Sequence, residues 1–328
     1  MLYRTLPGTD LQLSALTLGC WAIGGRWWGD DVDDDAAIEL IDAAWERGVT
    51  TFDTAPLYGH GHADELLVRA LGERRHEAVI VTKVGVRWDT PGEHPRSDLS
   101  PAHVIADAEA SLRRLRLDTL PLLLTHWPCE SETPIEATLG ALEALREAGK
   151  IRAYGLCNAD PQLLDRALAS APIAALQTPL SMIRRDFHGG LLQRCGEVDP
   201  SGRWRQKLGV LAYEPLARGL LTGKFSFSNG SPPTFPASDM RSRDPRFAEP
   251  VWSRLSPLVR ALRTVGERVG APPAALAVAW VLRQAGVSVA LVGCKRRAQL
   301  EESLQALELL RRDRVFAALA PFVAAARP

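Results

Sequence analysis

The sequence lacks an excess of charge of either sign. Lysine and arginine together number 39, and so do aspartate and glutamate, so the formal net charge at pH 7 is zero. Non-specific binding to nucleic acid or to an acidic membrane surface depends on a basic field, which a balanced chain does not provide. We therefore expect neither nucleic acid nor a membrane among its partners.

Long apolar runs and paired cysteines are missing as well. A membrane-spanning helix needs a run of about 18 apolar residues, and the sequence has none. Its first residues, Met1 to Thr5, do not open the apolar segment of a secretion signal. The five cysteines are odd in number, widely separated and never spaced as Cys-x-x-Cys. They predict reduced thiols and a cytoplasmic location.

What the sequence does have is an alternation of short apolar segments with longer amphipathic ones. The eight candidate strands are residues 16–19, 50–53, 79–82, 120–125, 151–156, 174–177, 209–213 and 288–292. They are apolar nearly throughout, as expected for parallel strands buried on both faces. A closed (β/α)8 barrel (TIM barrel) and an open doubly wound sheet both fit this α/β pattern. The strand number and the length of 328 residues favour the barrel, as a single domain over residues 1–328.

Two further features complete the predicted architecture. Residues 3–6 and 11–14 flank the turn Pro7-Gly8-Thr9-Asp10, which predicts an N-terminal β-hairpin before the first barrel strand. Residues 224–250, after the seventh strand, are polar and show little periodicity. Because helical and strand patterns resume beyond them, we expect a long loop rather than a linker, and loops of this length are usually functional.

Three helix starts are marked by a capping side chain followed by proline. The capping oxygen can accept from a free backbone N–H, and proline has no N–H to leave unpaired. The three pairs are Ser100-Pro101, Thr133-Pro134 and Asp160-Pro161. Glu136 follows Thr133 by three residues, which is the spacing of a capping box.

Ionisable side chains follow three successive predicted strands. Asp53, Lys83 and His126 stand at the C-terminal ends of the second, third and fourth strands, and Tyr58 lies in the loop after Asp53. A β/α barrel builds its active site at this end of its strands. Taken singly, Asp53 and Lys83 also fit an ion pair at the barrel rim, and His126 fits a hydrogen-bonded core histidine.

Taken together, the four side chains predict a proton-transfer site. The phenol of tyrosine has an ordinary pKa of about 10. A nearby lysine ammonium is expected to lower the pKa of Tyr58, and a carboxylate keeps that lysine charged. A histidine can hydrogen-bond the reacting oxygen. Such a set suits protonation of an oxygen that becomes negative as hydride reaches its carbon, which is carbonyl reduction.

The same residues lie in segments that resemble the aldo-keto reductases. The stretch from Phe52 to Asp64 is similar to the signature loop of that family, and Lys83 and His126-Trp127-Pro128 stand where the family has its lysine and histidine. The resemblance extends over nearly the whole chain, through residues 18–25, 111–115, 155–158, 212–216, 219–224 and 293–303. It implies a TIM barrel like that of the bacterial members with a long seventh loop.

The resemblance also implies a role for each matching position. Tyr58 would be the general acid, Lys83 and Asp53 would tune it, and His126 would orient the carbonyl. The implied reaction is the NADPH-dependent reduction of an aldehyde or ketone to an alcohol, or its reverse. The implied cofactor-binding residues are Trp21, Asn158, Gln177, Tyr213, Pro215, Leu216, Gly219, Lys224, Gly293, Lys295, Arg296, Gln299, Glu302 and Ser303.

Within this set, the resemblance assigns a part of the cofactor to each group. Asn158 and Gln177 would hold the nicotinamide carboxamide, Tyr213 would stack on the ring, and residues 216–224 would lie along the pyrophosphate. Lys295 and Arg296 match the cations that meet the 2′-phosphate of NADP(H). Two adjacent cations at a helix start suit a dianionic phosphate, which favours NADP(H) over NAD(H). The alternative is a solvated basic surface.

Four positions depart from the usual family pattern. Cys157 stands where serine is usual and weakens one expected hydrogen bond to the carboxamide. Ala63, Leu180 and Cys129 replace a serine, an aromatic residue and an aspartate. None of the four departures removes a catalytic group.

The substrate is less clearly marked than the chemistry. Trp27, Trp28, Trp88 and Trp127 lie in or near the strand-end loops. They predict an aromatic pocket for hydrophobic carbonyls, or else a plug of large side chains at the barrel mouth. Nothing in the sequence indicates an oligomeric state.

Two other functions compete with the reductase. Gly59-His60-Gly61-His62 superficially suggests a zinc hydrolase, but of the other histidines only His126 stands at a strand end, so we expect no metal. Members of the family can also serve as cofactor-binding, redox-sensing regulatory or interaction subunits. The complete set of acid, lysine, carboxylate and histidine favours catalysis over that role.

Overall fold

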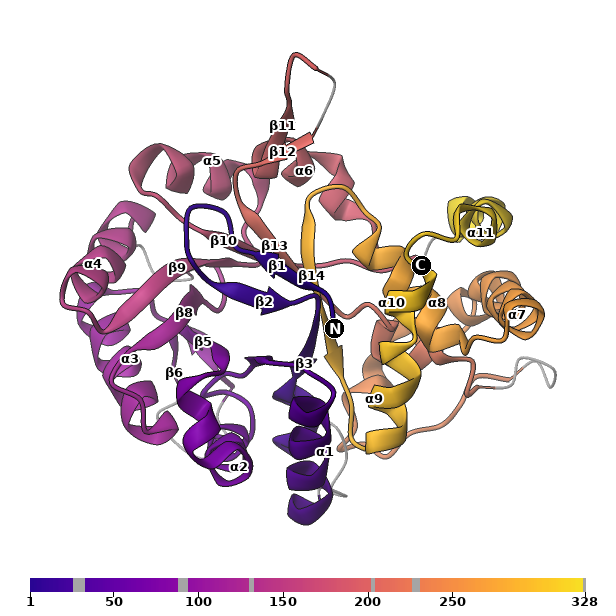
Figure 1. The fold of residues 1–328 in the computed structure, drawn as a ribbon, viewed down its shortest axis with the longest axis horizontal. Helices are drawn as coiled ribbons and strands as arrows, with labels where there is room; N and C mark the ends of the chain where they lie inside the picture. The colour runs from indigo at the N-terminus through magenta and orange to yellow at the C-terminus, as the bar shows by residue number, and fades with distance from the viewer. Residues whose placement is uncertain (26–32, 88–93, 130–132, 202–203, 226–230, 327–328) are drawn as a thin grey trace.

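Eight parallel strands close into a barrel surrounded by helices (Figure 1), which confirms the predicted (β/α)8 fold. The computed structural model describes residues 1–25, 33–87, 94–129, 133–201, 204–225 and 231–326. In chain order the barrel strands are β3 (Leu16–Gly19), β4 (Thr51–Asp53), β5 (Val79–Val84), β8 (Leu120–Thr125), β9 (Ile151–Cys157), β10 (Ala175–Pro179), β13 (Gly209–Tyr213) and β14 (Val287–Gly293). Each overlaps one of the eight predicted strands, and the barrel closes where β14 pairs with β3.

The strands are buried on both faces, which is why their sequences are continuously apolar. Side chains alternate between the faces of a strand. Val81 and Leu124 therefore lie inside the barrel, in a cluster that the leucines of the N-terminal hairpin complete. Ile80 and Leu123 point the other way and pack with residues of the surrounding helices.

Helices cover the outside of the barrel (Figure 1). They are α1 (Asp34–Glu46), α2 (His62–Leu71), α3 (Pro101–Leu115), α4 (Ile135–Glu147), α5 (Pro161–Ser170), α6 (Leu191–Cys195), α7 (Val251–Val269), α8 (Pro273–Leu282), α9 (Arg297–Leu304), α10 (Ala306–Leu309) and α11 (Asp313–Ala325). Short 3-10 helices are η1 (Cys20–Ile23), η2 (Gly72–His76), η3 (Asp186–Gly189), η4 (Ala217–Thr222), η5 (Met240–Arg243) and η6 (Pro245–Phe247). Within the described ranges, none of the helices has both the length and the apolar character needed to cross a membrane.

β-Hairpins lie outside the ring of barrel strands. The predicted N-terminal hairpin is present as β1 (Tyr3–Thr5) and β2 (Gln12–Ser14), and its buried Leu6, Leu11 and Leu13 belong to the barrel-interior cluster. β6 (Val86–Arg87) pairs with β7 (Arg96–Ser97), and β11 (Gly196–Val198) pairs with β12 (Trp204–Gln206). The last pair projects from the barrel at the top of Figure 1.

Two of the three predicted helix starts are correct, and one of these two has the predicted side-chain capping bond. Asp160 caps α5, accepting from the backbone N–H of Leu163 at 2.7 Å. Ser100 is the N-cap residue of α3 but makes no side-chain capping bond. The capping box at Thr133 is wrong, because α4 begins one residue later with Pro134 as its N-cap, and Glu136 instead pairs with Arg166 at 2.8 Å.

The long loop after the seventh strand is also present. Its described part contains η5 and η6 and leads into α7. Arg246 in η6 pairs with Glu214, which directly follows β13, at 3.0 Å. The loop is therefore tied back to the C-terminal end of the barrel, where a β/α barrel carries its active site.

Two adjacent barrel strands approach each other closely at a glycine, and substitution of this glycine tests the contact. Gly155 of β9 lies beside Ala175 of β10, and a Cβ atom at residue 155 would stand 2.1 Å from the carbonyl oxygen of Ala175. We expect Gly155→Ala to lower the free energy of unfolding by about 1–3 kcal/mol, because the two backbones must separate. Urea unfolding measures the loss.

Gly140 of α4 provides the matched control. A Cβ atom there has no neighbour within 4 Å, so Gly140→Ala should raise the free energy of unfolding by about 0.5–1 kcal/mol. Equal stability of the two variants would contradict the close approach of β9 and β10.

Candidate active site

Alternation along the strands brings three predicted catalytic side chains into the barrel mouth. Lys83 follows the inward-facing Val81 by two residues, and His126 follows the inward-facing Leu124 by two. Asp53 pairs in register with Val81 on the neighbouring strand. Residues two apart share a face, so the three side chains meet at the C-terminal end of the strands.

Lys83 is the centre of the hydrogen-bond network. Its Nζ lies 2.8 Å from Asp53 Oδ1, 3.0 Å from the Thr54 carbonyl oxygen and 3.0 Å from the Tyr58 hydroxyl. The lysine is 1% exposed and Asp53 is 3% exposed. A buried ammonium is costly unless it is paired and hydrogen-bonded, and here all three of its N–H donors have an acceptor.

The loop that carries Tyr58 is anchored by an ion pair whose carboxylate is buried and whose guanidinium is partly exposed. Asp64, which is fully buried, accepts from the Thr54 hydroxyl at 2.7 Å and from Arg114 Nε at 3.0 Å. The carbonyl of the same Thr54 is the second acceptor for Lys83. The ion pair between α2 and α3 therefore holds the loop from which Tyr58 reaches the lysine.

Burial is the main influence on the pKa of the proton donor, Tyr58. It raises the pKa of Tyr58 above the usual value, and the Lys83 ammonium only opposes this rise. The expected net lowering of this pKa is therefore wrong. Burial costs the phenolate more free energy of hydration than its attraction to the Lys83 ammonium restores. Burial also works against the charge of Lys83, but Asp53 and Tyr58 outweigh it and the pKa of the lysine rises. At neutral pH the pair is a phenol beside an ammonium.

His126 and Trp21 flank the phenol. The ring centroid of His126 lies 6.0 Å from that of Tyr58 in an edge-on arrangement, and the indole of Trp21 is stacked at 6.1 Å. Burial, together with the charge of Lys83, lowers the pKa of His126 well below its usual value. The imidazole is therefore neutral at pH 7 and can donate one hydrogen bond toward the cavity.

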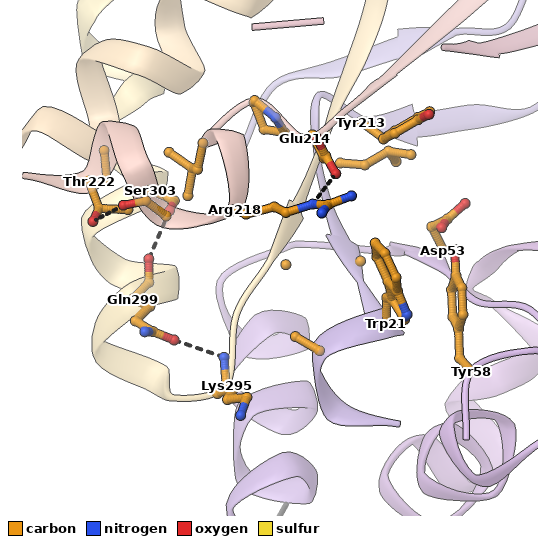
Figure 2. Close-up of a pocket in the computed structure, with 18 of the residues that line it drawn as sticks. Trp21, Asp53, Tyr58, Tyr213, Glu214, Arg218, Thr222, Lys295, Gln299 and Ser303 are labelled. Atoms are coloured by element: carbon orange, nitrogen blue, oxygen red, sulfur yellow. Dashed lines mark hydrogen bonds and ion pairs between the residues drawn. The ribbon is translucent and has the colours of Figure 1, made fainter. Parts of the chain in front are cut away.

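A cavity of about 880 Å³ opens from the phenol. Asp53, Tyr58 and His126 line it, and Lys83 lies directly behind Tyr58. All of the residues expected to bind a cofactor line it as well, namely Trp21, Asn158, Gln177, Tyr213, Pro215, Leu216, Gly219, Lys224, Gly293, Lys295, Arg296, Gln299, Glu302 and Ser303. In Figure 2 Trp21, Asp53 and Tyr58 stand at one end of this site and Lys295 and Gln299 at the other. Of the predicted substrate-pocket residues, Trp127 lines the cavity, while Trp27, Trp28 and Trp88 lie outside the described residues.

The amide groups next to the phenol are held in hydrogen bonds. Gln177 Nε2 donates to Asp53 Oδ2 at 2.7 Å, and the thiol of Cys157 lies 3.5 Å from Gln177 Oε1. Asn158, in the left-handed region at φ 61°, donates to the His126 carbonyl at 3.1 Å and accepts from the Tyr213 hydroxyl at 2.7 Å. These amides and the Tyr213 ring offer the donors, acceptors and flat surface that a nicotinamide carboxamide requires.

The far end of the cavity suits a phosphate. Lys295 and Arg296 precede α9, and Gln299 accepts from the backbone N–H of Lys295 at 2.8 Å. Gly219, at φ 90°, leaves room for the chain of Lys224, which a side chain there would contact at 3.1 Å. Among the described lining residues, six carry positive charge and three carry negative charge, which suits a polyanion.

Three of those cations were not singled out from the sequence, namely Arg184, Arg218 and Arg241. Arg218 lies at φ 55° and pairs with Glu214 at 2.8 Å and Asp244 at 3.0 Å, so its guanidinium is held beside the cavity (Figure 2). The signal that could have found these residues is weak: Arg241 lies in the long segment 224–250 that we expect to be functional, and Arg218 lies in the segment 216–224 expected along the pyrophosphate, but neither segment marks a single side chain.

The histidines of the suspected zinc motif do not converge on the cavity. His62 lies at the start of α2, and its Nε2 is 2.8 Å from Asp34 on α1. Across the described ranges, no three His, Cys, Asp or Glu side chains form a group that could hold a metal ion.

Comparison with known proteins gives consistent matches over nearly the whole chain. The model of the Aldo/keto reductase family matches residues 15–323. The chain is 34% identical to Aldo-keto reductase YhdN of Bacillus subtilis, covering 92% of this chain and 87% of that protein. It is 29% identical to the NADH-specific methylglyoxal reductase of Escherichia coli, covering 93% of each. The solved glycerol dehydrogenase AKR11B4 of Gluconobacter oxydans superposes with a TM-score of 0.86 at 35% identity, covering 99% of this chain and 95% of that one.

The anchor beneath the Tyr58 loop can be tested by stability. Arg114→Met leaves the Asp64 carboxylate buried without its cation, so we expect the free energy of unfolding to fall by about 3 kcal/mol. Guanidinium unfolding measures the loss. The exposed neighbour Arg113 on the same helix is the control, and Arg113→Met should change stability by less than about 0.5 kcal/mol.

A second substitution separates lost charge balance from lost packing. If the loss comes from the uncompensated carboxylate, adding Asp64→Asn to Arg114→Met should recover part of it. A double variant that is less stable than Arg114→Met would contradict the ion-pair interpretation.

Proposed function

Because this chain belongs to the aldo/keto reductase family of oxidoreductases, we propose that it reduces an aldehyde or ketone to an alcohol with NADPH as the reductant. The observation that carries the proposal is the contact of the Tyr58 hydroxyl with Lys83 Nζ at 3.0 Å, at the wall of a cavity large enough for a nucleotide. We also propose a cytoplasmic location, which the lack of a disulfide among the five described cysteines supports.

The residues divide the proton chemistry among them. When bound, the cofactor would supply hydride to the carbonyl carbon. Tyr58 would give its proton to the carbonyl oxygen, and the Lys83 ammonium would stabilise the phenolate that is left. The Asp53 carboxylate keeps Lys83 protonated and directs its ammonium toward Tyr58. The neutral His126 would donate a hydrogen bond to the same oxygen and so set the orientation of the carbonyl.

The reverse reaction uses the same groups. The Tyr58 phenolate would take the proton of an alcohol, and Lys83 would stabilise the phenolate before the transfer. Because burial raises the pKa of Tyr58, the phenolate is scarce at neutral pH.

The cofactor preference follows from the far end of the cavity. Lys295 and Arg296, beside the first turn of α9, would pair with a 2′-phosphate, which NADPH has and NADH lacks. One relative is named as NADH-specific, so the preference for NADPH in this chain depends on its own residues. Lys224, in the segment after β13, would add a further positive charge beside the same polyanion. Asn158 and Gln177 would hold the carboxamide.

Apolar side chains contribute to the cavity lining near the phenol. Trp21, Leu57 and Trp127 line the cavity around the phenol. This lining suits small or hydrophobic carbonyl compounds. Relatives named for methylglyoxal and for glycerol make short oxygenated aldehydes and ketones the first members of a test panel.

The proton donor can be tested by removing a single oxygen. Tyr58→Phe should reduce carbonyl turnover by at least about 1000-fold, since it removes the acid itself, while the dissociation constant for NADPH stays within about threefold. NADPH consumption and quenching of tryptophan fluorescence measure the two quantities. Near-normal turnover in this variant would refute the assignment, and a wild-type protein that binds NADPH but reduces no carbonyl would indicate a redox sensor.

The phosphate site can be tested by the ratio of two affinities. Lys295→Ala combined with Arg296→Ala should raise the dissociation constant for NADPH by roughly 100-fold, because two charge-assisted contacts are lost, and that for NADH by less than about threefold. Arg297→Ala, an exposed cation on the same turn that does not line the cavity, is the control. An unchanged ratio in the double variant would show that the two cations face solvent alone.

A further inference from the structure

A chain of buried hydrogen bonds connects the wall of the cavity to the proton donor. It runs from the Cys157 thiol to Gln177 Oε1 at 3.5 Å, from Gln177 Nε2 to Asp53 Oδ2 at 2.7 Å, and from Asp53 Oδ1 to Lys83 Nζ at 2.8 Å. Lys83 then contacts the Tyr58 hydroxyl. Cys157, Gln177, Asp53 and Lys83 are each no more than 3% exposed, so water does not compete for these contacts.

The chemistry of the groups fixes the direction of every bond in the chain. A carboxylate only accepts, so Gln177 must turn its NH2 group toward Asp53. Its carbonyl oxygen then faces Cys157 and also only accepts, so the thiol must be the donor. Burial raises the pKa of Cys157 to about 12, which keeps the hydrogen on the sulfur.

We propose that Gln177 is a positioning residue for the proton donor Tyr58, and that the Cys157 thiol sets the orientation of its amide. Asp53 uses one oxygen for Gln177 and the other for Lys83, so the amide fixes the carboxylate that aims the ammonium at the phenol. Without the thiol, only the bond to Asp53 holds the amide, and an amide that turns over presents its oxygen to the carboxylate, which repels it.

The same amide remains available to the cofactor. An amide has two N–H donors and two lone pairs on its oxygen, and the chain uses one of each. The other N–H and lone pair are left for a carboxamide. The inference rests on the proposed function, and it makes Gln177 the point where the cofactor site and the proton donor share one side chain.

The test compares two variants that differ by one oxygen. Cys157→Ser keeps a donor at the position, and Cys157→Ala removes it. At saturating NADPH and carbonyl, we expect kcat of the alanine variant to lie about fivefold to tenfold below that of the serine variant, the rate equivalent of one hydrogen bond. The solvent deuterium isotope effect on kcat should be larger in the alanine variant, because misplacing Lys83 slows the proton step.

Two further variants test this interpretation independently. Cys195→Ala removes a buried thiol in α6, outside the cavity, and should leave kcat and the isotope effect unchanged. Gln177→Met keeps the side-chain length but has no comparable donor or acceptor. It should lower kcat and raise the isotope effect at least as much as Cys157→Ala, and it tests the chain even where the alanine variant folds poorly. Fluorescence titration with NADPH gives the cofactor affinity of each variant without turnover.

Equal kcat values and equal isotope effects in the alanine and serine variants would overturn the inference while the wild-type turnover upheld the proposed function. A change confined to NADPH affinity in Cys157→Ala and Gln177→Met would also overturn it, since both residues would then serve cofactor binding alone. A wild-type protein without carbonyl turnover would instead refute the proposed function.

Discussion

The burial of one positive charge is the constraint on which the site depends. The ammonium of Lys83 lies where water is excluded, and it keeps its charge because three oxygens surround it. All three belong to the short segment from Asp53 to Tyr58, so this segment enters the barrel mouth in one conformation. The Asp64–Arg114 ion pair and the Gln177 amide hold the groups that pair with this ammonium, and the His126 imidazole nearby is neutral.

The fold and the location of the site could be predicted because both depend on short-range patterns. Continuous apolar segments indicated buried parallel strands, and their count indicated a barrel; the structure confirms both. Once a barrel is assumed, residues at strand ends must meet, which is why Asp53, Lys83 and His126 could be grouped without knowledge of any distance. The positions suggested by family resemblance lie around the same cavity, and their roles stay predictions.

What could not be predicted depends on contacts between distant segments. The Thr133 capping box failed because α4 begins one residue later than the local pattern suggests, and the tertiary partner of Glu136 lies on another helix. Arg218 lines the cavity, and one of the two carboxylates that hold its guanidinium, Asp244, lies 26 residues further along the chain. The direction of the pKa shift of Tyr58 required knowing how completely the phenol is buried, which no spacing reveals.

The closure of the barrel between β14 and β3 has a consequence for how the molecule is made. One part of the cavity lining comes from the first barrel strand and the turn after it, and the part next to it comes from the last strand and α9. While the ribosome is still adding residues, a nascent polypeptide that lacks β14 and α9 has an incomplete cavity lining. Nucleotide binding therefore requires that the last barrel strand has been made and has paired with the first.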